Sequence, residues 1–173
     1  QDKRLYEQDI AASIVHTQMI IKQKIIKSEV GNKIINGLKK IKSQIDKGKF
    51  EFKVKFEDIH LNIEKALFGI IGPSAGFLHT ARSRNDQVVT DFKLWIKEAS
   101  KETLKTISLV MKSLIKKAEK NIDTVMPGMT HLKNGQPISF AHYLLSYFEM
   151  LKRDKKRFEN NLKLLDECPL GLS

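Results

Sequence analysis

Residues 79–121 read HTARSRNDQ followed by VVTDFKLWIKEASKETLKTISLVMKSLIKKAEKN, so a short polar segment runs directly into a long periodic one. From residue 86 to residue 121 there is no Pro or Gly, and apolar side chains recur every three or four positions. This spacing predicts one amphipathic helix. About 35 residues at roughly 1.5 Å each give a rod of roughly 50 Å. Because a small domain cannot cover such a helix alone, we expect a helical bundle with partner chains.

The polar segment at residues 79–87 lacks large aliphatic side chains. It brings two guanidinium groups, two hydroxyls, an imidazole, two amides and a carboxylate to the start of this helix. Arg binds carboxylate or phosphate through two parallel hydrogen bonds, and a helix start adds unpaired N–H groups. The segment therefore predicts an anion site. The alternative is a polar surface loop in which Asn85 or Asp86 caps the helix.

Upstream of this segment, helical spacing of apolar residues predicts two helices, at residues 5–26 and 28–48, that pair as an antiparallel hairpin. Residues 50–56 alternate apolar and polar side chains, which is typical of a strand. A lone strand could not satisfy its backbone, so we predict an extended loop there. A third helix is expected to open at residues 57–60 and to close at Gly72-Pro73, with a loop at residues 72–76.

Downstream of the long helix, residues 123–137 contain two Gly and two Pro residues and predict a structured loop rich in hydrogen-bonding side chains. The apolar residues after Pro137 recur at alternating four- and three-residue steps, which indicates another bundle helix. Residues 169–173 are turn residues that close no element. The whole pattern predicts an all-α fold, with a small N-terminal helical domain at residues 1–78 and an incomplete central bundle at residues 79–173.

The amino-acid composition argues against several classes of protein. The 173 residues are 41% hydrophobic, which suffices for a core, and no run approaches the roughly 18 apolar residues of a membrane span. We expect a cytoplasmic protein, since no signal-type stretch follows the N-terminus and Cys168 is the single cysteine. The net charge of +11 raises the alternative of a nucleic-acid binder. The basic residues are mostly dispersed Lys without interleaved aromatic residues, so we expect no nucleic-acid partner.

Two polar segments separated by one long helix resemble the signature regions of the argininosuccinate lyase family, within the fumarase and aspartase superfamily. Residues 79–87 resemble the first signature, and residues 126–132 with Gln136-Pro137 resemble the second. Residues 9–13 and 57–60 agree with two further stretches of the family. Ala81 stands where the family usually has Gly, and Met129 where an aromatic residue is common. Members of the family are much longer, so the chain resembles their N-terminal portion.

The resemblance implies an anti elimination that converts argininosuccinate to arginine and fumarate in arginine biosynthesis, without a metal or organic cofactor. It implies that His131 is the acid/base histidine, whereas the proton-abstracting base is commonly a Ser on a loop that would follow residue 173. The residues implied to contact the substrate are Ser83, Arg84, Asn85, Thr130 and Asp58. Of these, Asp58 would face the arginine end or support the residues that do.

The resemblance also implies a homotetramer in which three subunits build each active site. The roughly 50 Å rod between the two polar segments agrees, because it predicts that they serve different pockets. The 173 residues alone are therefore expected to be inactive. Two alternatives stay open: another fumarate-releasing lyase, such as adenylosuccinate lyase, fumarase or aspartase, and a non-catalytic structural homologue like the lens crystallins.

Overall fold

The structure is a computed structural model that describes residues 2–169, so all but the first residue of the predicted turn segment at residues 169–173 lies outside the described residues. The described residues divide into two compact units, residues 2–95 with 168–169 and residues 96–167. The predicted all-α class is confirmed, since helices build both units apart from one two-stranded hairpin. Among residues 2–169, none of the helices combines the length and apolar character needed to cross a membrane.

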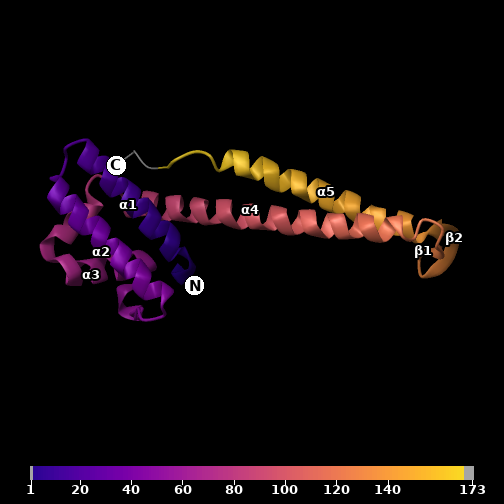
Figure 1. Cartoon of the computed structure of the whole chain (residues 1–173), viewed down its shortest axis with the longest axis horizontal. Coiled ribbons are helices and arrows are strands. Elements are labelled where there is room, and N and C mark those ends of the chain that lie inside the picture. Colours follow the sequence, from indigo (N-terminus) through magenta and orange to yellow (C-terminus); the bar gives the residue numbers. More distant parts are fainter. Residues whose placement is uncertain (1, 170–173) are drawn as a thin grey trace. The chain divides into compact units, whose positions relative to one another are not determined.

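The first unit is built on three helices that pack side by side, α1 (Tyr6–Lys22), α2 (Ser28–Asp46) and α3 (Ile59–Ile71) (Figure 1). The predicted pairing of the first two helices is confirmed. Helix α1 ends earlier than predicted, because Lys24 has φ 58°, in a left-handed conformation that a helix does not continue through. Apolar side chains from all three helices form one core, which includes Ile10, Ile20, Ile34, Leu38, Ile41, Ile59, Ile63 and Leu67.

The connection from α2 to α3 confirms the prediction of an extended loop. Residues 50–56 form no strand, and Val54–Phe56 wind into the short 3-10 helix η2. The side-chain amide of Asn62 takes the place of a neighbouring strand: its Oδ1 accepts from Lys53 N at 2.8 Å, and its Nδ2 donates to Lys53 O at 3.3 Å. Phe50 and Phe52 pack against the core, which accounts for the alternating pattern.

The predicted loop after α3 is wrong. Gly72 ends α3 with φ 67°, as predicted, but Gly72–His79 then wind into the 3-10 helix η3. The physical reason is burial, because Ala75 and Leu78 lie in the core and hold the segment against it. Helix α4 (Arg84–Glu119) follows and begins two residues before the predicted position.

The second unit contains most of α4, the strands β1 (Val125–Thr130) and β2 (Lys133–Ser139), and helix α5 (Phe140–Leu164), which runs back alongside α4 (Figure 1). The two strands form an antiparallel hairpin where a structured loop was predicted. That prediction missed the strands because Pro and Gly interrupt the alternating pattern that indicates a strand. A small cluster of Ala118, Ala141 and Leu144 packs the end of α4 against the start of α5.

Candidate functional site

The first polar segment is held in place by α1. His16 Nε2 donates to Thr80 O over 2.9 Å, and Arg82 Nη1 donates to Ser13 Oγ over 3.0 Å. Ser13 and His16 are three residues apart and therefore share one face of α1. The loop before α4 is therefore held to α1 by one bond to its backbone and one to a side chain.

Ser83 is the residue at which the loop becomes helix. Its Oγ accepts from Asn85 N at 3.3 Å and its carbonyl oxygen accepts from Gln87 N at 3.1 Å, which is the geometry of an N-cap. The alternative of a cap at Asn85 or Asp86 is thus wrong. The structure places Ser83, Arg84 and Asn85 consecutively at the N-terminus of α4, where helix N–H groups and the helix dipole favour an anion.

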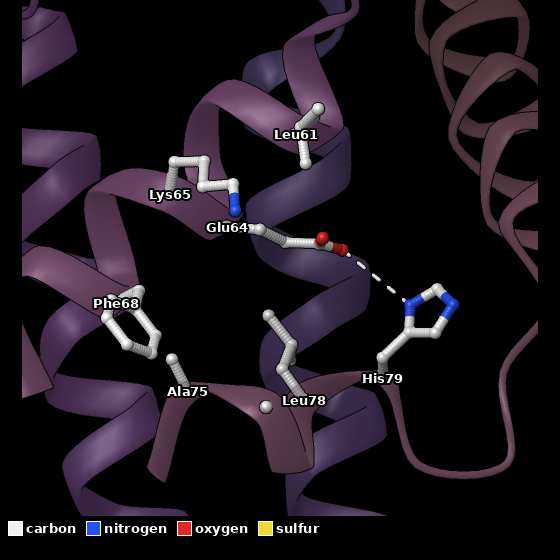
Figure 2. Close-up of a pocket in the computed structure, with 8 residues that line it drawn as sticks. Leu61, Glu64, Lys65, Phe68, Ala75, Leu78 and His79 are labelled. Atoms are coloured by element: carbon white, nitrogen blue, oxygen red, sulfur yellow. Dashed lines mark ion pairs between the residues drawn. The ribbon is translucent and has the colours of Figure 1, made fainter. Parts of the chain in front are cut away.

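Arg84 is held by two neighbours. Its Nη2 lies 2.8 Å from Oε2 of Glu64 on α3, and its Nη1 donates to Gln87 Oε1 over 2.7 Å. The other oxygen of Glu64 lies 3.6 Å from Nδ1 of His79, and Figure 2 shows these two side chains pointing toward each other from α3 and η3. Glu64 therefore links the guanidinium of Arg84 to the imidazole of His79.

A buried polar cluster lies behind Gln87. Gln87 Nε2 donates to Oδ1 of Asp9 over 2.5 Å, and the same oxygen lies 3.0 Å from Nδ1 of His60. Asp91 approaches the same imidazole nitrogen, with Oδ2 at 3.4 Å from Nδ1. All four side chains are buried, so helices α1, α3 and α4 meet through polar groups rather than through apolar packing alone.

The two carboxyl groups of this cluster titrate in opposite directions. Burial alone would raise the pKa of Asp9, but the hydrogen bonds from His60 and Gln87 hold it below its usual value. Burial raises the pKa of Asp91 to about 9, and the charge of Asp9 adds to the effect. Asp91 therefore carries a proton at neutral pH, and as an acid it can donate to Asp9.

The same cluster is the place among residues 2–169 where a metal ion could be considered. One ligand atom each from Asp9, His60 and Asp91 lies within 4.8 Å of the others. The guanidinium of Arg82 is buried beside them, and its positive charge already acts on both carboxyl groups. Because Arg82 supplies the counter-charge that a cation would bring, this donor set does not favour a metal.

Asp58 has a structural task in addition to its predicted role. It is the N-cap of α3, and its Oδ1 accepts from Leu61 N at 2.6 Å. The side chain lines a recess with Phe52, Lys53 and Asn62. None of the contacts described for it reaches residues 83–85, so the structure of this chain does not bring it together with the first polar segment.

The second polar segment belongs to the other unit. Thr130 pairs with Lys133 across the hairpin, which leaves His131 and Leu132 as the two turn residues. Both have positive φ, 48° and 62°, as a type I′ turn requires. Turns of this type favour Asn and Gly, so His131 occupies a strained position. The side chains of Thr130 and His131 are exposed within this chain.

Comparison with known proteins gives the family of the chain. Residues 1–171 match the sequence family described as "Lyase". The chain belongs to this lyase family. The relatives of this chain include the argininosuccinate lyase of Pelagibacter ubique, 58% identical over 172 residues, which are 99% of this chain and 37% of the relative. The argininosuccinate lyase of Ehrlichia ruminantium strain Welgevonden is 49% identical over 170 residues, again 37% of its length. The chain thus spans little more than a third of the length of these curated relatives.

Solved structures confirm the predicted fumarase and aspartase-like fold of the chain. EDDS lyase in complex with formate superimposes with a TM-score of 0.85 at 27% identity, over 96% of this chain and 32% of that one. Class II fumarase from Schistosoma mansoni gives a TM-score of 0.81 over 99% of this chain and 40% of that one. At 16% identity the fumarase shows the shared fold alone.

Proposed function

We propose that this chain is the N-terminal part of an argininosuccinate lyase, which splits argininosuccinate into arginine and fumarate by anti elimination. The observation that carries the proposal is Arg84, held at the N-terminus of α4 between Ser83 and Asn85. Relatives named argininosuccinate lyase, 46% to 58% identical over nearly the whole chain, support the choice of substrate.

The proposed roles follow from the chemistry. The elimination removes a weakly acidic proton beside a carboxylate, so the doubly charged intermediate needs several hydrogen-bond donors. Ser83, Arg84 and Asn85 offer a hydroxyl, a guanidinium and an amide at the positive end of a helix dipole. Thr130 adds a hydroxyl from the hairpin, and His131 protonates the departing guanidinium nitrogen.

Asp58 is proposed to contact the arginine end of the substrate. A carboxylate matches a guanidinium bidentately, which makes this end of the substrate a fitting partner. Its capping bond uses one oxygen, so the same side chain could serve both tasks.

The proposal includes a homotetramer in which three subunits contribute to each site. Exposed apolar side chains on the second unit support it, since α4 carries Leu109 and Val110 and α5 carries Leu145 and Met150. Exposed faces of this kind mark interaction surfaces. We also propose that the domain boundary lies between residues 78 and 79, and that the protein works in the cytoplasm.

A substrate panel tests the function. The full-length protein is mixed in turn with argininosuccinate, adenylosuccinate, malate and aspartate, and fumarate is followed by its absorbance. We expect turnover with argininosuccinate, and none by the isolated 173 residues. Activity with a different member of the panel would replace the proposed substrate. A folded full-length protein that is inactive on all four would favour a non-catalytic homologue.

A further inference from the structure

The Arg84 guanidinium is oriented before any substrate arrives. Its bonds to Glu64 and Gln87 use two of the five N–H donors that an Arg side chain has. An Arg side chain otherwise samples many rotamers, and fixing it on binding costs conformational entropy. Two acceptors at 2.8 Å and 2.7 Å therefore fix the direction in which the remaining donors point.

The positions of both acceptors, Glu64 and Gln87, are fixed by the buried cluster. Glu64 lies one helical turn after His60 on α3, and His60 is fixed by its contact with Asp9. Gln87 is fixed by its own bond to the same carboxylate of Asp9. Contacts within the buried cluster thus position the two side chains that accept hydrogen bonds from Arg84.

The charge of Glu64 argues against a purely electrostatic role. A carboxylate beside an anion-binding guanidinium lowers the local positive potential and weakens the attraction for an anionic substrate. The Glu64 carboxylate, 2.8 Å from Arg84, therefore weakens the binding of an anion but fixes the orientation of the guanidinium. A guanidinium that binds a carboxylate must be placed closely, because the pair forms two parallel hydrogen bonds of fixed geometry.

We propose that Glu64 is a positioning residue that aims Arg84 at a substrate carboxylate and does not itself touch the substrate. The inference rests on the proposed function, because it takes Arg84 to bind the succinyl part. It assigns a task to a residue that lies outside the two polar segments.

Two conservative variants of the full-length protein separate position from charge. Glu64→Gln keeps an acceptor oxygen at the same reach and removes the charge, whereas Glu64→Asp keeps the charge and withdraws it by one methylene. We expect Glu64→Gln to keep KM for argininosuccinate within about threefold of wild type. Glu64→Asp should raise KM about tenfold or more with a smaller change in kcat, because uniform binding is lost. Lys65→Ala, the next residue on α3 and exposed, is the matched control and should behave as wild type.

The outcomes are distinct. Wild-type protein without activity on argininosuccinate overturns the proposed function and this inference with it. An active wild type whose Glu64→Asp variant has normal KM overturns the inference alone. A Glu64→Gln variant as impaired as Glu64→Asp would assign the effect to charge and would also overturn it. Thermal unfolding of each variant checks that the fold is retained. If Glu64→Asp does not fold, Glu64→Ala, which removes the acceptor oxygens, replaces it: a raised KM supports the inference, and a normal KM overturns it.

Discussion

Gln87 of α4 donates a hydrogen bond to Asp9 of α1 over 2.5 Å, between residues that are 78 positions apart in the sequence. Because the other end of the Gln87 amide accepts from Arg84, one side chain connects the buried carboxylate to the candidate anion site. The buried carboxylate of Asp9 is therefore part of what holds the start of α4 in place.

Replacing Asp91 with Asn tests the protonation of this cluster. Because the pKa of Asp91 is raised to about 9, the folded protein keeps this proton up to that pH, whereas the unfolded chain releases it near the ordinary Asp value of 3.8. Between these values the folded state binds more protons, so the contribution of Asp91 to stability falls as pH rises. Asp91→Asn is neutral in both states and should flatten this decline. The check is the thermal midpoint of the full-length protein at about pH 5, 7 and 9, which span the window; equal declines for wild type and variant would contradict the assignment.

Ala81→Gly should stabilise the loop ahead of α4. Ala81 has φ 52°, and a residue with a Cβ in this conformation loses roughly 1 kcal/mol or more relative to Gly. After the greater unfolded-state entropy of Gly is counted, we expect a gain of up to about 1 kcal/mol. The matched control is Ala11→Gly, at an exposed position within α1, which should lose about 0.5–1 kcal/mol. Chemical unfolding of both variants measures the difference, and a gain at both positions would speak against the backbone explanation.

Asp58→Ser separates the capping role of this residue from its proposed contact with substrate. Ser is also a good N-cap, so the variant should unfold like wild type, while Asp58→Ala should lose about 1 kcal/mol. If the carboxylate meets the arginine end of the substrate, Asp58→Ser raises KM about tenfold despite its normal stability. Steady-state kinetics beside thermal unfolding provide both numbers. Normal kinetics in the Ser variant would leave Asp58 with its cap alone.

His131→Asn should remove the proposed general acid without disturbing the hairpin. Asn accepts positive φ readily, so the turn at φ 48° is kept. Loss of general acid catalysis typically lowers turnover by about 100- to 10,000-fold. The measurement is kcat of the full-length variant, with circular dichroism as the test of folding. Near-normal turnover would exclude His131 from the mechanism.

The helices and the polar segments could be predicted because they depend on local patterns. Apolar residues at steps of three and four marked every long helix, and Gly72 marked the end of α3. The strand pattern at Phe50 and Phe52 was correctly set aside, since no second segment could pair with it. The hairpin around His131 was missed for the opposite reason, because its pairing partners are rich in Pro and Gly.

The buried cluster and Glu64 depend on contacts between distant segments, which periodicity does not report. The sequence contains one weak signal of these contacts. Three helices each carry polar residues four positions apart on a face that is otherwise buried: Asp9 and Ser13, His60 and Glu64, and Gln87 and Asp91. Two polar residues at that spacing lie on the same face of a helix. When that face is buried, they need hydrogen-bond partners on a neighbouring helix. Such a signal names the participants without telling which pairs meet.

The hydrogen bond between Asp9 and Gln87 can form only after both residues have been synthesised. At about 5–20 residues per second, the ribosome needs roughly 4–16 s to add the 78 positions that separate them. During this interval α1 lacks the partners of Asp9 and Ser13 that α4 and the loop before it supply, namely Gln87 and Arg82. The N-terminal helices can collapse on their apolar core early, but they acquire their final polar contacts only when the start of α4 emerges.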